Sequence, residues 1–431
     1  MLTEADHDLL LRLLELPTAG PLEVGADGPE PQLWQAQYDY AEAAAKSGFV
    51  VVRHESPRPD CLLGPHVPLS VRLAAAAEPG FLGSQPSLVL GLGPDLPRAD
   101  TVMFNVHLDT VAGVQPVGYD GGVFHGRGAI DAKGPAVALL AGIRAALAAD
   151  PSLAEHTRIL IQAVAGEEGG AMGVFGTRPL VRQGYYGRLN LFCEPTGMRV
   201  LPRCTAAMTA CVRVDGDDAI DDNPGAGHNA TVLLGLIAQR LAEVLPGHAA
   251  DGQVCVAGVH TGHLHNRVYG TGRLMLNLSY GRAETGDRLA EVLESEVAAA
   301  LLEFGARYRR QPDLARTAAD AAAITKVEWH KRGLPALESD VDGSLTELLG
   351  TGLPRWPADE PAFTCDALWM AGLPEASTAV LGPGRLDRNH AHAEGEFAEE
   401  AELVEFAAAV SAILLRFAHQ RATRLTAGRA Q

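Results

Sequence analysis

Apolar residues along the chain fall into two alternating patterns. Short apolar runs such as 101–106 and 157–165 are typical of strands buried on both faces. Between them apolar residues recur with helical spacing, as in 9–14. This alternation predicts an α/β fold with helices packed on a central mixed sheet. The expected strands are 48–53, 70–76, 87–91, 101–106, 157–165, 189–193 and 377–381, and the expected helices are 38–47, 136–149, 341–349, 366–371 and 400–421.

A different order of elements occupies the middle of the chain. From residue 207 onward the pattern predicts a strand, a helix, two strands, a helix and a strand. This β-α-β-β-α-β order is typical of the ferredoxin-like or split βαβ unit, which is compact on its own. We therefore expect an inserted domain at 206–331 that divides a larger domain into 1–205 and 332–431. Its expected strands are 207–215, 253–260, 272–280 and 322–329, and its expected helices are 229–245 and 286–306.

Length, charge and cysteine content narrow the class of protein. A chain of 431 residues is too long for one ordinary core, which agrees with two domains. The formal net charge of −18, with no compensating Lys/Arg run, disfavours nucleic acid and anionic membranes as partners. The six cysteines include no C-x-x-C pair, which argues against a disulfide framework or a structural zinc site.

The sequence also bears on the compartment. No apolar run reaches the length of about 18 residues that a membrane span needs. The N-terminal sequence MLTEADHDLLLRLLEL is acidic and heptad-like, whereas a signal peptide is basic and then apolar. We therefore expect a cytoplasmic protein.

Side chains with the chemistry of metal ligands follow the strand 101–106. His107 and Asp109 come at its end, and Asp131 follows in a glycine-rich turn. Positions i and i+2 of an extended backbone share one side, so Asp109 can accept from one imidazole nitrogen of His107 and leave the other free. A lone His-x-Asp is most often a satisfied polar pair. A metal site therefore needs support from residues downstream.

Further acids and imidazoles follow later strands. Two buried strands end in Glu167-Glu168 and in Glu194, and a late loop holds His390 and His392. A Glu-Glu pair is commonly a solvated turn, but these glutamates stand at strand ends, where function is concentrated in α/β sheets. Two imidazoles and three carboxylates, with a spare glutamate, are the inventory of a co-catalytic two-metal site.

Taken in order, the motifs resemble those of metallopeptidase family twenty, the group that includes acetylornithine deacetylase, succinyl-diaminopimelate desuccinylase, aminoacylase and glutamate carboxypeptidase. The resemblance covers nearly the whole chain and implies a zinc-peptidase-like catalytic domain, an inserted lid or dimerisation domain, and a homodimer formed through that domain. The matching stretches are HLDTV at 107–111, GRGAIDAKG at 126–134, GEEGG at 166–170, EPTG at 194–197, GPG at 382–384 and AHAEGEF at 391–397.

The resemblance implies two divalent metal ions, with zinc favoured and cobalt or manganese as alternatives. Asp131 is then the bridging carboxylate. His107 and Glu194 complete one metal site, and Glu168 with a late histidine completes the other.

Two histidines compete for the last ligand position. His392 is favoured because Glu396 and Phe397 follow it at four and five residues, as an acid and an aromatic residue do in the family. The count from Gly382 instead favours His390, so both remain candidates.

The resemblance also implies the catalytic roles. Asp109 orients His107, and Glu167 is the general base on a metal-bridging water. The substrate is then a small-molecule amide, namely an N-acyl amino acid or a small peptide-like compound. The matching substrate-binding residues are Asn266, Arg282, Gly382 and Gly384.

One departure from the family pattern stands in the expected inserted domain. Relatives carry a histidine that stabilises the oxyanion in the partner protomer's site, and Ile220 stands at that position here. Loss of one oxyanion donor costs about 10²–10³ in rate. His228 begins a predicted helix, where a capping or surface role is the commoner one. Ile220 keeps open an alternative in which hydrolysis is lost or repurposed, as in a binding protein or an amide-forming or rearranging enzyme.

Overall fold

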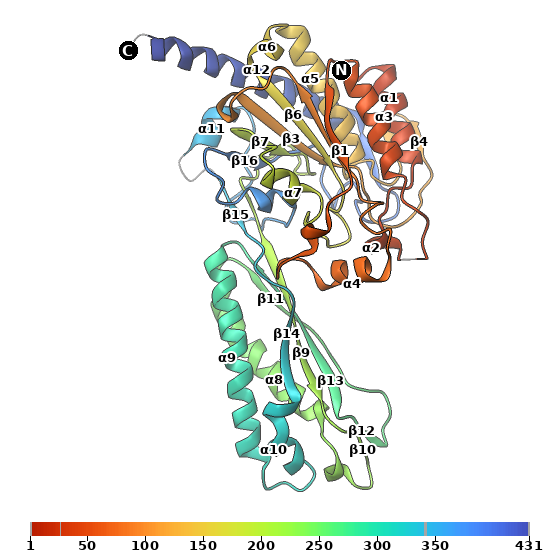
Figure 1. Ribbon diagram of the computed structural model, residues 1–431, viewed down its shortest axis with the longest axis vertical. Helices are drawn as coiled ribbons and strands as arrows, with labels where there is room; N and C mark the ends of the chain where they lie inside the picture. The colour runs from red at the N-terminus through yellow and green to blue at the C-terminus, as the bar shows by residue number, and fades with distance from the viewer. Residues whose placement is uncertain (1, 26, 340–342, 430–431) are drawn as a thin grey trace. The chain divides into compact units, whose positions relative to one another are not determined.

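The structure is a computed structural model that describes residues 2–25, 27–339 and 343–429 (Figure 1). The chain forms two compact units. The larger unit combines the residues up to Leu63, Ser70–Cys204 and the residues from Leu337 onward, and the smaller unit combines Gly64–Leu69 with Thr205–Ala336.

A six-stranded mixed sheet forms the centre of the larger unit. The four strands β6, β3, β7 and β16 run parallel to one another, whereas β2 pairs antiparallel with both β1 and β6. The strands β2, β3, β7 and β16 are buried along their whole length, as expected where helices cover both faces. In sheet order the strands are β1 (Val50–Glu55), β2 (Ser87–Leu92), β6 (Arg158–Val164), β3 (Thr101–His107), β7 (Leu189–Phe192) and β16 (Ser377–Val380).

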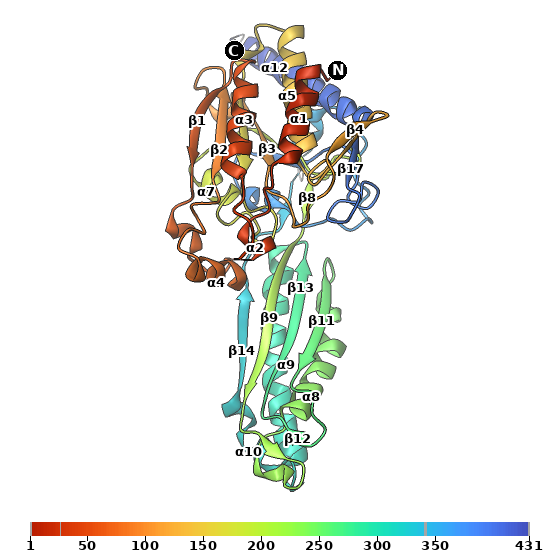
Figure 2. The same cartoon turned by 90° about the vertical axis from the view of Figure 1, so that its right-hand side faces the viewer.

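Helices lie on both faces of this sheet. On one face lie α1 (Glu4–Glu15), α3 (Leu33–Ala45), α5 (Lys133–Ala149) and α12 (Glu400–Arg429), and on the other lies α7 (Thr177–Arg182), as Figures 1 and 2 show. Close packing of α5 on α12 depends on Gly142, because a Cβ there would stand 2.6 Å from the Ala407 carbonyl oxygen. This architecture confirms the predicted α/β class with helices on a mixed sheet.

Shorter elements complete the larger unit. The strands β4 (Gly118–Asp120), β5 (Val123–His125) and β17 (Phe397–Glu399) form a small antiparallel sheet, and β8 (Arg203–Cys204) pairs with β15 (Leu337–Glu338). The remaining helices are α2 (Pro21–Val24), α4 (Leu69–Ala77), α6 (Leu153–His156) and α11 (Ser344–Leu349), with 3-10 turns at Pro59–Leu62, Arg98–Asp100 and Asp366–Met370.

The smaller unit is a four-stranded antiparallel sheet with helices on one face (Figure 2). Its strand order, β11-β13-β9-β14, is that of a split βαβ unit. The strand β13 alternates between exposed and buried residues, because only one face is covered. Its main elements are β9 (Ala206–Asp215), α8 (Ala230–Val244), β11 (Gln253–His260), β13 (Thr271–Tyr280), α9 (Ala283–Tyr308), α10 (Ala315–Ile324) and β14 (Thr325–Lys331), with a short β10 (Ala219–Ile220) and β12 (Arg267–Val268) pair.

Among the described residues, one helical stretch, Ala230–His248, is apolar and long enough to cross a membrane by length and composition alone. It contains α8, whose Leu233, Leu234, Ile237 and Leu241 are buried and which contacts β9, β11 and β13. This packing is that of a core helix.

One expected element is wrong and another is shifted, while the expected helix 341–349 begins at 341–342, outside the described residues. The stretch 70–76 was expected as a strand but belongs to α4, because Leu73 and four consecutive alanines favour a helix over an extended chain. The strand expected at 322–329 begins only at Thr325, because the alanine-rich stretch before it forms α10.

Candidate metal centre and active site

The parallel strands bring most of the predicted site residues to one edge of the sheet. His107 ends β3 and is paired in register with Val164, so the turn after β6 that carries Glu167 and Glu168 lies beside it. Glu194 follows β7, the other neighbour of β3. The carboxyl ends of these parallel strands therefore form one cluster, as the general rule for α/β sheets predicts.

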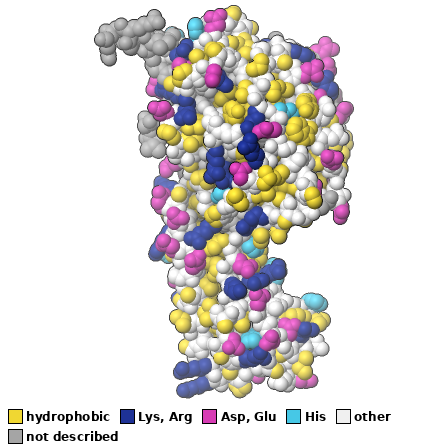
Figure 3. Space-filling model, in the orientation of Figure 1, with side chains coloured by type: hydrophobic (Ala, Val, Ile, Leu, Met, Phe, Trp, Pro, Cys, Tyr) yellow, Lys and Arg dark blue, Asp and Glu magenta, His cyan; other side chains and the backbone are white. Residues whose placement is uncertain are grey.

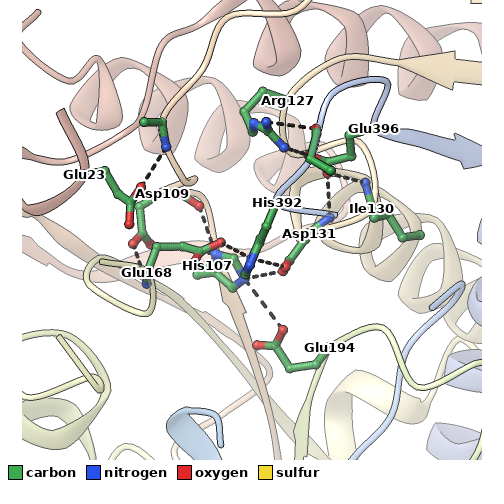
Figure 4. Close-up of polar contacts among 12 residues, drawn as sticks. Glu23, His107, Asp109, Arg127, Ile130, Asp131, Glu168, Glu194, His392 and Glu396 are labelled. Atoms are coloured by element: carbon green, nitrogen blue, oxygen red, sulfur yellow. Dashed lines mark hydrogen bonds and ion pairs between the residues drawn. The ribbon is translucent and has the colours of Figure 1, made fainter. Parts of the chain in front are cut away.

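Ligand atoms of three of these residues lie within 4.8 Å of one another, namely those of His107, Asp131 and Glu168 (Figure 4). His107 Nε2 lies 3.0 Å from Asp131 Oδ1 and 3.7 Å from Glu194 Oε2. His392 Nε2 lies 3.0 Å from both Asp131 Oδ2 and Glu168 Oε1. Asp131 thus stands between the two imidazoles.

The structure separates the two candidate histidines. Both have positive φ, 54° at His390 and 62° at His392, so the loop turns sharply at each. His392 reaches the acids of the cluster, whereas the ring of His390 packs edge-on against Phe397 with centroids 5.9 Å apart.

Asp109 lies beside His107, but its backbone carbonyl and not its expected carboxylate accepts the hydrogen bond from the imidazole. The Asp109 backbone carbonyl accepts a hydrogen bond from His107 Nδ1 at 2.9 Å, while the nearer carboxylate oxygen stands 3.8 Å away. The other carboxylate oxygen accepts from the backbone N–H groups of Gly166 and Glu168 at 3.0 and 3.1 Å. The side chain of Asp109 therefore fixes the turn that carries the glutamates.

This geometry fits a bound cation. A carbonyl can only accept, so Nδ1 of His107 carries a hydrogen, and Nε2 is the nitrogen that would offer its lone pair to a metal ion. Nε2 faces carboxylate oxygens of Asp131 and Glu194. Carboxylates gathered around imidazole nitrogens are stabilised by positive charge, from ring protons or from a metal ion, and this mixed donor set suits zinc, cobalt or manganese.

Electrostatics point the same way. Burial raises the pKa of Glu194, and burial with the neighbouring Glu194 charge raises that of Glu167 well above its usual range. Burial raises the pKa of Glu168 to about 7, against the lowering effect of its hydrogen bond with His392. Burial alone lowers the pKa of His107, but Glu194 and Asp131 outweigh it and raise the pKa well above its usual range. These acids repel one another, so positive charge stabilises the cluster.

Three supporting residues were missed in the sequence. Glu396 is buried and accepts hydrogen bonds from the backbone N–H groups of Ile130 and Asp131 at 3.1 and 3.2 Å, and Arg127 donates to it at 2.6 Å (Figure 4). Lys133, in the same GRGAIDAKG stretch, is 1% exposed and donates to the Leu16 carbonyl, and burial lowers its pKa to about 7.

The third missed residue is Glu23, which lies in a stretch where no chemistry was expected. Its carboxylate accepts from the N–H of Ala112 at 2.9 Å and so holds the loop after Asp109. Only the match of Glu396 to the family pattern could have pointed to any of these three residues.

Of the expected substrate-binding residues, the two glycines lie against this cluster. A Cβ on Gly382 would stand 2.3 Å from the Glu194 carbonyl oxygen, and Gly384 has φ of 60° and lies against Ile130. Glycine is required at both positions by close approach.

The other expected residues belong to the smaller unit. Asn266 is exposed in a turn, and Arg282 caps the start of α9 with its Nε 3.9 Å from Asp251. Ile220 is 59% exposed in β10. His228 is buried, accepts from the Asp217 N–H at 2.8 Å and lies 3.2 Å from Asp320, so its contacts are structural.

A second group of possible ligands, Cys211, Glu328 and His330, lies in the smaller unit. Arg213 Nε stands 3.1 Å from the Glu328 carboxylate and already neutralises it. The cluster around His107 lacks any such arginine partner for Asp131, Glu168 or Glu194 among the described residues.

Comparisons with known proteins identify a family and a fold for this chain. A family model described as Peptidase family M20/M25/M40 matches residues 103–416. Two curated relatives are putative LysW-lysine/LysW-ornithine hydrolases. The one from Aeropyrum pernix is 30% identical over 216 residues, which are 49% of this chain and 57% of the relative. The one from Pyrobaculum aerophilum is 42% identical over 100 residues, 23% of this chain and 26% of the relative. The matches thus span little more than half and about a quarter of these relatives.

Solved structures share the fold. An aminopeptidase from Bacillus cereus matches with a TM-score of 0.67 at 17% identity. The match covers 96% of this chain and 98% of the aminopeptidase chain. A metallo-carboxypeptidase from Sulfolobus solfataricus has a TM-score of 0.65 at 12% identity, with 97% and 100% covered. A tripeptidase from Staphylococcus aureus has a TM-score of 0.67 at 15% identity, with 96% and 98% covered.

Proposed function

The chain belongs to peptidase family M20/M25/M40 and is a metallohydrolase acting on amide bonds, and from this premise we propose that it is a dinuclear enzyme for a small N-acylated substrate. The observation that carries the proposal is the convergence of two imidazoles on the Asp131 carboxylate. One carboxylate between two nitrogen ligands can bridge a pair of metal ions.

We assign the metal ligands accordingly. Asp131 bridges the two ions, His107 and Glu194 complete one site, and Glu168 and His392 complete the other. Zinc is our first choice, with cobalt and manganese as alternatives, since the donors are imidazoles and carboxylates. When bound, the ions supply Lewis-acid polarisation of the scissile carbonyl and lower the pKa of the attacking water.

The chain's own residues then handle the protons. Glu167 is half-buried next to Glu168 and is the proposed general base: it takes a proton from the attacking water and passes it to the leaving amine nitrogen. Glu396 holds the backbone of Asp131 in place, and the backbone carbonyl of Asp109 holds His107 in one tautomer. The products are a carboxylate and an amine.

The proposed substrate is an N-acyl amino acid or a small peptide-like amide in the cytoplasm. The lysine and ornithine in the names of the two curated relatives make acylated forms of these amino acids the first compounds to test. Asn266, Arg282, Gly382 and Gly384 are the proposed substrate contacts, with Arg282 available to pair with a substrate carboxylate.

The first experiment measures metal content by elemental analysis together with amine release from a panel of N-acyl amino acids and dipeptides. We expect about two metal ions per chain. Glu167→Ala lowers the rate by about 10²–10⁴ while the metal is retained, because the general base alone is removed. Glu155→Ala is the matched control, since Glu155 is exposed in α6. A metal-loaded protein that releases amine from no member of the panel contradicts the proposed substrate class.

Ile220 favours one alternative, a relative in which hydrolysis is lost or redirected. Its side chain is exposed and cannot donate a hydrogen bond to an oxyanion. In that case Ile220→His raises amine release above that of the natural protein, whereas Ile220→Ala leaves it unchanged.

A further inference from the structure

A cavity of about 440 Å³ lies in the larger unit, between the segment that follows β1 and the helix α7. It is lined by four arginines and one acid, namely Arg53, Arg58, Arg178, Arg182 and Asp60, together with Pro57, Cys61, Pro179 and Gln183. None of the residues assigned to the metal centre lines it. Figure 3 shows Lys and Arg side chains gathered on this face of the larger unit.

Arg178 is the most unusual of these residues. Only 4% of it is exposed, and among the described residues no carboxylate lies within ion-pair distance of it, although the charge of Asp60 acts on it from farther away. Its Nη1 donates to the Cys61 carbonyl at 3.1 Å, its guanidinium lies 5.4 Å from the Trp369 ring centroid, and its buried Nε has no hydrogen-bond partner. A buried guanidinium without an anionic partner is costly, so a fold retains it where something else satisfies it.

The neighbouring arginines add to this excess of charge. Arg53 pairs with Glu55 and donates to Gln183, but Arg58 and Arg182 are exposed and make no ion pair with a described residue. Burial, and then the charge of Arg182, lower the pKa of Arg178 to about 10, against the smaller opposing effects of Cys61 and Asp60. A chain with 53 acids and 35 bases thus concentrates like positive charge around one cavity.

We propose that this arginine cavity binds a small anion that carries a phosphoryl group. Guanidinium groups match phosphate oxygens in pairs of hydrogen bonds, and three arginines without a carboxylate partner suit a doubly charged group better than a single carboxylate. The volume lies in the range of small-molecule sites, so the phosphoryl group can belong to a phosphorylated metabolite or be free phosphate.

The test is a calorimetric titration of the full-length, metal-loaded protein with inorganic phosphate, pyrophosphate and succinate. We expect phosphate or pyrophosphate to bind with Kd of about 1 mM or tighter and succinate to bind more weakly. Arg182→Gln weakens phosphate binding about tenfold or more, since it removes charge-assisted hydrogen bonds. Arg72→Gln removes an exposed arginine of the same unit outside the cavity, and leaves binding unchanged.

The variants separate this site from the metal centre, which can also attract phosphate. Arg182 lies on the surface, so its substitution does not endanger folding, and Arg178→Gln tests the buried arginine in turn. Phosphate affinity that is equal in the natural protein and in Arg182→Gln and Arg58→Gln overturns the proposal, as does absence of binding by both phosphates. Succinate that binds as tightly as phosphate overturns the assigned chemistry. These experiments measure anion binding and not amine release, so they test the arginine cavity independently of the proposed hydrolase activity.

Discussion

Two histidines of one loop show how strongly local geometry decides a residue's role. His390 and His392 share a left-handed backbone conformation and are separated by a single alanine. His392 faces Asp131 and Glu168, and these two hydrogen bonds raise its pKa to about 10. His390 instead packs on Phe397. The pair therefore offers a substitution and its own control.

We predict that His392→Ala loses about one metal ion per chain and most amine release, because Asp131 and Glu168 keep only part of one coordination shell. His390→Ala keeps the metal content of the natural protein. Elemental analysis of the two variants after the same dialysis measures their metal content. Equal metal loss in both variants would contradict the assignment of His392 as the metal ligand.

For individual residues, the sequence predicts which residue types form the site but not which atoms contact one another. Strand ends place His107, Glu168 and Glu194 together wherever parallel strands are neighbours, which depends only on hydrophobic pattern and topology. That a backbone carbonyl, and not a carboxylate, holds His107 depends on side-chain torsions that no spacing reveals. The burial of Lys133 does not follow from its sequence, because a lysine is rarely fully buried.

Among the helices, α1 contains a carboxylate, that of Asp6, which both caps the helix and pairs with a neighbouring helix. Asp6 accepts from the N–H and hydroxyl of Thr3, both at 2.7 Å, which closes a capping box. It also accepts two hydrogen bonds from Arg144 of α5. Burial works against the charge, but Arg144 and Thr3 outweigh it and hold the pKa of Asp6 below its ordinary value of 3.8.

We predict that Asp6→Asn lowers the free energy of unfolding at neutral pH by about 1–2 kcal/mol, a value discounted because Arg144 is partly exposed. Since the folded-state pKa is lowered, the contribution is present above pH 3.8 and is lost as the pH falls through the folded-state pKa. Denaturant titrations across this range measure the difference. Asp8→Asn, which changes an exposed acid of the same helix, serves as the control. If the difference in free energy of unfolding between the natural protein and Asp6→Asn does not become smaller at acid pH, the assigned role of the Asp6 charge is wrong.

Elements with strong patterns were predicted well, and the errors have a shared cause. Buried strands such as β3 and β6 carry β-branched runs that leave little choice. Alanine-rich stretches are ambiguous, because alanine is apolar enough to resemble a short buried strand but forms helices best. Both α4 and α10 lie in such stretches.

For the whole molecule, the homodimer expected from the family resemblance leads us to a prediction about β11. It is an edge strand of eight residues in the sheet of the smaller unit, with its outer backbone groups available to a second copy. We predict that the protein sediments at twice the 45.4 kDa of one chain.

The variant Ala257→Pro tests this prediction. Ala257 is exposed at an irregularity in the pairing of β11 with β13, and proline is tolerated at bulges and edges of a sheet. We expect the sedimenting mass to halve with little change in the melting temperature, whereas Ala257→Ser stays dimeric. A natural protein that sediments as a single chain at all concentrations contradicts the prediction.

The site joins residues that lie far apart in the sequence, and this separation affects when the site can form during folding. Glu168 and His392 are 224 residues apart in the chain, and Arg127 and Glu396 are 269 apart. Contacts between such distant positions form late, because the entropy of closing a long loop is lost before the contact is gained. We therefore expect a refolding chain to form its helices before it can bind a metal ion at this site.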